Sequence, residues 1–167
     1  MVRIITISRE FGSGGRTVGK EVAACLGIPC YDRELIEKVA EETGYAREFV
    51  EEESEYAPSA NDGPCVIVGR CADYILKDRS DCLHVFVYAD KVFRAERIVK
   101  QYGETGVEPR KRLQEKDKKR KLNYKYFTDR EWGKRENYHL SIDSGFFGIE
   151  KAVSIIVDAA GGAKENE

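Results

Sequence analysis

The residue types best suited to phosphate chemistry lie in one glycine-rich stretch, residues 7–22, with the sequence ISREFGSGGRTVGKEV. Glycines let backbone N–H groups close around an oxyanion, and a basic side chain nearby adds charge. The nucleotide-binding pattern G-x-x-x-x-G-K-[ST] fits this stretch imperfectly, in either of two registers. One register ends at Gly19-Lys20, but Glu21 then stands where Ser or Thr belongs, and its carboxylate would repel a phosphate. In the other register, Lys20 is a solvent-facing residue of the following helix.

The flanking elements favour the second register. The β-branched run at 2–8 predicts a buried strand, and a helical period is already established at Val18. A phosphate-binding loop joins the end of a strand to the N-terminus of a helix, where free N–H groups and the helix dipole attract an anion. A loop over residues 10–17 fills that gap. It places Glu10 at the first glycine of the pattern and Arg16 at the lysine.

The second register gives each residue of the loop a role. Backbone N–H groups of the glycines would surround the phosphate, and Arg16 could grip it bidentately, although arginine is bulkier than lysine. The Thr17 hydroxyl would reach Mg²⁺. The predicted nucleotide-binding residues are Gly12, Ser13, Gly14, Gly15, Arg16 and Thr17. The alternative is a glycine-rich turn from strand to helix that binds no ligand.

Strand-like and helix-like segments alternate along the chain, which predicts βαβ units and a parallel sheet. The segments expected to form strands are 2–8, 28–31, 65–69, 83–89 and 139–143. We expect one α/β domain over residues 1–160 and a frayed tail over 161–167. His84 and His139 lie inside strand patterns, so both are interpreted as structural.

Composition excludes some classes of protein. The chain is 41% hydrophobic and 35% charged, with a net charge of −2, so nothing indicates a global attraction to nucleic acid or to a membrane surface. Apolar runs are too short to span a membrane, and the N-terminus lacks the pattern of a signal peptide. The five cysteines form no C-x-x-C pair and are expected to be reduced, mostly buried thiols. These features favour a cytoplasmic protein.

Several motifs together resemble the cytidylate-kinase-like P-loop proteins, which are relatives of the nucleoside monophosphate kinases. The segments that carry the resemblance are ISREFGSGGRTVGK, IPCYDRELI, CVIVGRCADYIL, LHVFVYAD with its RAERI helix, and NYHLSIDSGFFGIEKAVSIIV. The resemblance implies a three-layer P-loop NTPase fold, with a parallel five-stranded sheet in the order 2-3-1-4-5. It also implies ATP, Mg²⁺ and nucleotide substrates, a helical lid, and transfer of the γ-phosphoryl group of Mg-ATP to a nucleoside monophosphate, with cytidylate the leading acceptor.

The lid implied by the resemblance falls on residues 108–132, where RKRLQEKDKKRK is strongly basic. Asp117 and Arg120 match the end of the family's R-D-x-x-D-x-x-R pattern. The leading Arg-Asp pair of that pattern is absent, and Arg112 or Lys116 could supply the missing charge. These four residues are the catalytic candidates, together with Arg16. The alternative is a merely solvated cationic helix. Tyr124, Tyr126, Phe127 and Trp132 are expected to pack at the base of the lid, and the alternative is a platform on which a base stacks.

Acceptor-binding candidates follow the strands, because open α/β sheets bind ligands at the carboxyl ends of their strands. Asp32 and Arg70 each lie just past a predicted strand, and Arg70 matches the arginine of the family's G-R-D-I-G motif. Cys71 replaces the Asp of that motif, and Asp73 follows two residues later. The alternatives are that Asp32 only caps a helix and that Arg70 forms a surface ion pair. Arg97 is a further candidate to face the nucleotide.

The resemblance implies that residues 37–64 are a shortened version of the family's acceptor-binding flap, with many carboxylates and only Lys38 and Arg47 as basic residues. This is a poor composition for binding a second phosphate. It leaves an alternative function open, namely a nucleotide-binding sensor or regulatory pseudo-kinase without turnover. Nucleic-acid binding through residues 110–121 is the weakest hypothesis, because the chain is net negative and has no recognised binding motif.

Overall fold

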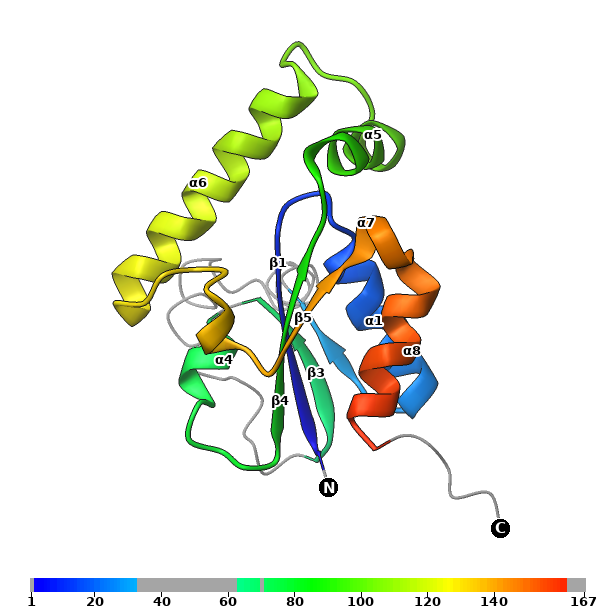
Figure 1. The fold of residues 1–167 in the computed structure, drawn as a ribbon, viewed down its shortest axis with the longest axis vertical. Helices are drawn as coiled ribbons and strands as arrows, with labels where there is room; N and C mark the ends of the chain where they lie inside the picture. Colours follow the sequence, from blue (N-terminus) through cyan, green and yellow to red (C-terminus); the bar gives the residue numbers. More distant parts are fainter. Residues whose placement is uncertain (1, 33–62, 70, 162–167) are drawn as a thin grey trace, which may run out of the picture.

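The structure is a computed structural model that describes residues 2–32, 63–69 and 71–161 (Figure 1). In this part of the chain, five parallel strands form one sheet in the order β2-β3-β1-β4-β5. The strands are β1 (Ile4–Arg9), β2 (Cys30–Tyr31), β3 (Cys65–Val68), β4 (Cys82–Tyr88) and β5 (Leu140–Asp143). The predicted sheet and its strand order are confirmed.

The central strand β1 is covered on both faces, which explains its nearly continuous apolar sequence. Ile5 pairs with Val66 of β3 on one side and with Leu83 of β4 on the other. Ile5 and Ile7 belong to one core cluster, whereas Ile4 belongs to a second, smaller cluster. Alternate residues of the strand therefore bury against opposite layers of helices.

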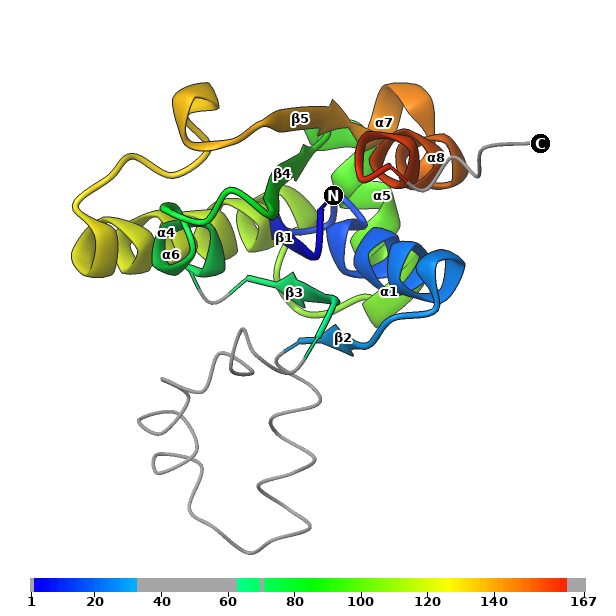
Figure 2. The same cartoon turned by 90° about the horizontal axis from the view of Figure 1, so that it is seen from below.

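Helices lie on both sides of the sheet (Figure 2). On one side α1 and α8 pack together, and Val18, Val22 and Ile156 fill the larger core cluster. On the other side lie α4 and the C-terminal part of α6. The helices are α1 (Gly15–Leu26), α4 (Ala72–Ile75), α5 (Lys91–Tyr102), α6 (Pro109–Thr128), α7 (Ser144–Phe147) and α8 (Ile149–Ala159), with a 3₁₀ turn at Arg135–Asn137.

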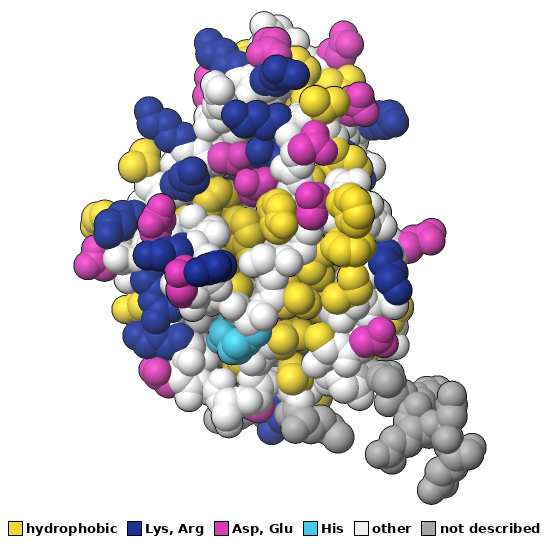
Figure 3. Space-filling model, viewed as in Figure 1, with side chains coloured by type: hydrophobic (Ala, Val, Ile, Leu, Met, Phe, Trp, Pro, Cys, Tyr) yellow, Lys and Arg dark blue, Asp and Glu magenta, His cyan; other side chains and the backbone are white. Residues whose placement is uncertain are grey.

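The region expected to form the lid, residues 108–132, contains the helix α6, and Figure 3 shows many Lys and Arg side chains along it. Glu108 caps its start by accepting a hydrogen bond from the N–H of Arg110, and Pro109 occupies the first turn. Leu113 and Tyr124 are buried and anchor the helix. The predicted aromatic packing is only partly correct, because Tyr126 is 82% exposed.

Three features bear on the expectations from composition. No described helix is both long and apolar enough to cross a membrane. The cysteines are free thiols; Cys65 and Cys82 are buried in strands, whereas Cys25 is exposed on α1. Across the described residues, no group of three or more His, Cys, Asp and Glu side chains could hold a metal ion.

The two histidines join β4 to the chain before β5. Their rings stack with centroids 4.9 Å apart, and Nδ1 of His139 accepts a hydrogen bond from the N–H of His84 at 3.0 Å. The His84 ring is buried, and its Nδ1 lies 2.8 Å from the hydroxyl of Thr6. Both residues therefore support the sheet.

We expect His84 to make stability depend on pH. Burial, and then the neighbouring His139, lower the pKa of His84 below its ordinary value of 6.5. The unfolded chain therefore binds more protons than the native protein near and below pH 6.5, and the free energy of unfolding should fall as the pH drops through that range. Urea unfolding at pH 7.5 and pH 5.5 measures the effect. The double variant His84→Asn/His139→Asn should show a shallower pH dependence, and an equal dependence in both proteins would contradict the assignment.

Candidate active site

The glycine-rich loop is shorter than predicted. Strand β1 ends at Arg9, the N–H of Glu10 donates to the carbonyl of Val87 at 3.0 Å, and α1 begins at Gly15 after Gly14, whose φ is 81°. The loop thus covers residues 10–14, whereas residues 10–17 were expected. Arg16 and Thr17 lie in the first turn of α1, where free N–H groups and the positive end of the helix dipole favour an anion.

Contacts within the loop and with neighbouring elements determine the shape of the loop. A Cβ on Gly12 would lie 2.8 Å from the carbonyl oxygen of Arg94, and the φ of Gly12 is +80°, so only glycine fits there. Ser13 is fully buried, and its hydroxyl donates to the carbonyl of Glu10 at 2.8 Å. Its own carbonyl accepts a 2.6 Å hydrogen bond from the hydroxyl of Ser144. The Ser13 side chain therefore serves the shape of the loop.

Glu10, at the first glycine of the pattern, ties the loop to the end of β4. Its carboxylate accepts a hydrogen bond from the N–H of Ala89 at 3.3 Å and lies 3.2 Å from the guanidinium of Arg94. Burial raises the pKa of Glu10, and the positive charge of Arg94 opposes that shift. The negative charge at this position is therefore compensated inside the fold.

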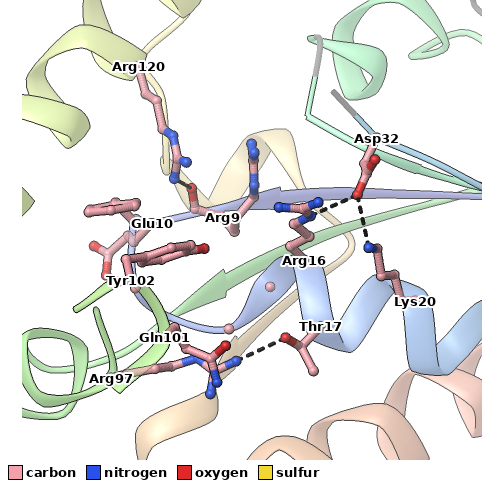
Figure 4. Close-up of a pocket in the computed structure, with 14 residues that line it drawn as sticks. Arg9, Glu10, Arg16, Thr17, Lys20, Asp32, Arg97, Gln101, Tyr102 and Arg120 are labelled. Atoms are coloured by element: carbon pink, nitrogen blue, oxygen red, sulfur yellow. Dashed lines mark hydrogen bonds and ion pairs between the residues drawn. The ribbon is translucent and has the colours of Figure 1, made fainter. Parts of the chain in front are cut away.

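A cavity of about 470 Å³ opens above the loop (Figure 4). Five of its lining side chains are cationic and two are carboxylates. The lining residues that carry charge are Arg9, Glu10, Arg16, Lys20, Asp32, Arg97 and Arg120. Lys20 was predicted to face solvent, yet it lines this cavity although its side chain is 52% exposed. The excess of positive charge at the N-terminus of a helix suits a ligand with several phosphate groups.

Arg16 and Asp32 meet across the cavity. Nε of Arg16 donates to Oδ2 of Asp32 at 2.8 Å, and Nζ of Lys20 lies 3.8 Å from the same oxygen. Asp32 is buried and directly follows β2. Its position just past a strand agrees with the expectation, whereas the helix that it was alternatively expected to cap falls outside the described residues.

Thr17 faces a guanidinium. Its Oγ1 accepts a hydrogen bond from Nη2 of Arg97 at 2.9 Å. A hydroxyl oxygen is a ligand that Mg²⁺ accepts, and magnesium in kinases is held largely by phosphate oxygens and water. The Thr17 hydroxyl in the first turn of α1 fits a Mg²⁺ ion that arrives on nucleotide phosphates, because it would offer one oxygen ligand. Arg97, which sequence reasoning named as a candidate, lies on the cavity wall.

Two of the four lid candidates contact the loop. Asp117 accepts hydrogen bonds from the N–H of Phe11 at 2.9 Å and from Nη1 of Arg94 at 2.6 Å. Nη1 of Arg120 donates to the carbonyl of Arg9 at 2.9 Å, and its guanidinium lines the cavity. Burial lowers the pKa of Arg120, and Asp117 opposes that shift. Helix α6 is therefore attached to the loop by Asp117 and to the last residue of β1 by Arg120.

The other two lid candidates lie outside the cavity wall. Arg112 donates to the carbonyl of Gly103 at 3.0 Å, and Nζ of Lys116 lies 6.0 Å from the centre of the Phe11 ring. Neither residue lines the cavity. Lys116 is thus near the loop, whereas Arg112 supports the turn between α5 and α6.

The remaining acceptor candidates have different positions. Arg70 lies outside the described residues. Asp73 is 1% exposed, and its two carboxylate oxygens accept hydrogen bonds from Ser8 at 3.2 Å and from the hydroxyl of Tyr124 at 2.6 Å. Because both oxygens are used inside the fold and Asp73 does not line the cavity, this geometry does not support contact between Asp73 and an acceptor. Asp73 instead joins β1, α4 and α6.

Sequence reasoning missed several residues of the cavity. Arg9 is the last residue of β1 and lines the cavity, as do Gln101 and Tyr102 at the end of α5. The strand-end rule that singled out Asp32 applies equally to Arg9, so that signal was present in the sequence. The role of Arg94 as a central ion-pair partner had no local signal, because its contacts come from segments far apart in the chain.

The strand order and the glycine-rich loop between β1 and α1 define the α/β fold of the P-loop kinases. A shikimate kinase from Acinetobacter baumannii shares this fold, with a TM-score of 0.59 and 20% identity over 99% of this chain and 97% of that one. The chain belongs to the cytidylate kinase-like family, whose model matches residues 4–62 and 55–145.

Individual similar proteins are consistent with membership of that family. A cytidylate kinase from Archaeoglobus fulgidus is 33% identical over 93% of each chain. Another from Methanopyrus kandleri is 25% identical over 98% of this chain and 96% of the relative. A solved structure of a protein from Eubacterium ventriosum is similar with a TM-score of 0.79 and 31% identity, over 96% of this chain and 99% of that one.

Proposed function

We propose that this protein transfers the γ-phosphoryl group of Mg-ATP to a nucleoside monophosphate, with cytidylate as the leading acceptor. The observation that carries the proposal is the cationic cavity between the loop, the start of α1 and the lid helix. Family membership and the similar cytidylate kinases support the choice of acceptor.

The chemistry requires positioning and charge neutralisation more than a general base. An oxygen of the acceptor phosphate forms a bond to the γ-phosphorus, and the bond from that phosphorus to the β-phosphate oxygen breaks, which yields ADP and the nucleoside diphosphate. Negative charge moves between phosphate oxygens during this transfer. The cavity offers guanidinium groups at that place and no histidine, in agreement with such a mechanism.

Most of the predicted residues have a role in this proposal. Backbone N–H groups at 12–15 would hold the ATP phosphates, and Thr17 would contact the Mg²⁺ that ATP brings, once Arg97 turns toward a phosphate. Arg16 and Arg120, which approach from α1 and from the lid, would neutralise the transferred group. Asp32 and Arg70 are proposed for the acceptor side. Asp117 would set the position of the lid.

The decisive assay is ADP formation from Mg-ATP with CMP, UMP, AMP and GMP as acceptors, with the Arg16→Ala variant as the blank. CMP-dependent ADP that disappears in the variant supports the proposal. Faster turnover with another monophosphate would correct the acceptor. The absence of acceptor-dependent ADP, in a protein that still binds ATP, would replace the proposal with the nucleotide-binding sensor.

Binding of ATP itself should raise thermal stability. A ligand that binds only the native state contributes about 2.7 kcal/mol at 100 times its Kd, which corresponds to a Tm increase of about 5 to 10 °C for a chain of this size. Differential scanning fluorimetry with Mg-ATP measures it. Adenosine, which lacks the phosphates, is the matched control and should shift the Tm little. Equal shifts with ATP and adenosine would contradict the phosphate-loop assignment.

A further inference from the structure

Arg9 is a cavity residue to which neither the family pattern nor the loop pattern gives a role. It is the last residue of β1, and Figure 4 shows its guanidinium between those of Arg120 and Arg16. Its side chain is half-buried and makes no hydrogen bond or ion pair with any described residue. Its backbone carbonyl, in contrast, is used by Arg120.

The surrounding fold makes room for this side chain. A Cβ on Gly69, just after β3, would lie 2.7 Å from Nη1 of Arg9. The φ of Gly69 is +79°, a conformation that side chains other than glycine rarely adopt. The guanidinium of Arg9 therefore rests against the carboxyl end of β3, on the side of the loop where Asp32 follows β2.

The burial and the positive charges around Arg9 favour the binding of an anion. Burial first, and then the neighbouring guanidinium groups of Arg120 and Arg16, lower the pKa of Arg9 to about 9. The group stays protonated at neutral pH, in a place where solvation is poor and where Arg120 and Arg16 oppose its charge while Asp32 favours it. Clustered guanidinium groups of this kind cost free energy, which a bound phosphate dianion would offset through charge-assisted hydrogen bonds.

The position of Arg9 indicates whether this phosphate belongs to ATP or to the acceptor. Arg97 and Thr17 lie on the side of the loop toward α5, whereas Arg9 points to the ends of β2 and β3 (Figure 4). We propose that Arg9 binds the phosphate of the acceptor monophosphate, beside the group that is transferred. This inference rests on the proposed function and adds a residue to its acceptor site.

Separate titrations of the two substrates test the inference. Isothermal titration calorimetry measures the Kd of CMP and of Mg-ATP for the wild-type protein and for Arg9→Met, which keeps most of the side-chain volume. Arg3→Met is the matched control, because Arg3 is exposed just before the opposite end of β1. Loss of one charge-assisted contact should raise the Kd of CMP by about 10- to 100-fold and leave that of Mg-ATP within about threefold. Arg9→Lys, which keeps the charge, should recover part of the loss.

The outcomes separate this inference from the proposed function. An unchanged CMP affinity in Arg9→Met, or equal weakening of CMP and Mg-ATP, would overturn the role of Arg9 even if wild-type protein phosphorylates CMP. If wild-type protein turns over no acceptor but loses monophosphate binding on Arg9→Met, the proposed function fails and the phosphate contact stands. If no monophosphate binds to the wild-type protein, both are overturned. A Gly69→Ala variant, which crowds Arg9 without removing its charge, should also weaken CMP more than Mg-ATP.

Discussion

Turnover by the Arg16→Ala variant is expected to fall by about 10²- to 10³-fold with Mg-ATP and CMP, the usual effect of removing one preorganised donor to developing charge. Arg16 lies in the first turn of α1, where the helix N-terminus already attracts phosphate, and its guanidinium faces the cavity. In the present structure it is paired with Asp32, at 2.8 Å. A phosphate bound at the loop would share this guanidinium. Steady-state rates of ADP formation, with each substrate varied in turn, measure the loss.

Companion variants distinguish a direct role of Arg16 from an indirect one. Removing Arg16 also takes away the guanidinium that lies 2.8 Å from the buried carboxylate of Asp32. The double variant Arg16→Ala/Asp32→Asn removes the charge of that carboxylate as well. If the double variant regains the wild-type rate, Arg16 serves only to neutralise Asp32 and its catalytic role is wrong. Arg16→Lys should be intermediate, because an ammonium group cannot form the bidentate contact, and Arg3→Ala should retain the wild-type rate.

The parts of the fold that were predictable are those with short-range signals. The continuous apolar run of β1 is typical of a strand covered on both faces, and Ile4 and Ile5 are indeed buried in opposite core clusters. The glycine at 27 ends α1 as expected, with a φ of +66°. The end of the loop was less predictable, because the first turn of a helix has little periodicity by which it can be recognised.

The site depends on contacts that no local pattern records. Asp117 lies 106 residues from Phe11 in sequence, yet its carboxylate accepts the N–H of Phe11. The family pattern suggested a catalytic role for Asp117, but only the structure reveals its contact with the loop. Asp73 shows the opposite case. Its position near a strand end suggested a ligand contact, whereas the hydroxyl of Tyr124, 51 residues away, takes one of its oxygens at 2.6 Å.

Arg94 connects the two halves of this arrangement. It is 4% exposed and lies between the loop and the lid helix, and its guanidinium pairs with Glu10 at 3.2 Å and with Asp117 at 2.6 Å. It also donates to the carbonyl of Phe11 at 3.2 Å. The buried guanidinium of Arg94 thus pairs both with Glu10, which stands at the first glycine position of the loop pattern, and with Asp117 of α6. The unusual loop sequence and the lid are therefore parts of one ion-pair network.

The second large expected effect is a loss of stability when this ion-pair network is broken. Asp117→Ala should lower the free energy of unfolding by about 3 kcal/mol, because removing one partner of a buried ion pair leaves an uncompensated charge. The Asp117 side chain is 16% exposed and that of Arg94 only 5%. The N–H of Phe11 loses its acceptor as well. Glu10 still compensates part of the charge of Arg94, which keeps the expected loss near the lower end of the range for such pairs. Urea unfolding monitored by circular dichroism measures the change.

Two further variants establish that the loss comes from the network. Glu115→Ala removes an exposed carboxylate from the same helix and should change stability by no more than about 0.5 kcal/mol. Asp117→Asn retains an acceptor for the N–H of Phe11 but not the charge, so it should lie between the wild type and Asp117→Ala. If Asp117→Ala loses turnover at full stability, Asp117 acts on substrate, as the family pattern alone suggested. If it loses stability and its remaining native fraction turns over at a reduced rate, the lid depends on Arg94 for its position over the phosphates. That second result is the expected one, since the carboxylate of Asp117 points to Arg94 and to the loop backbone.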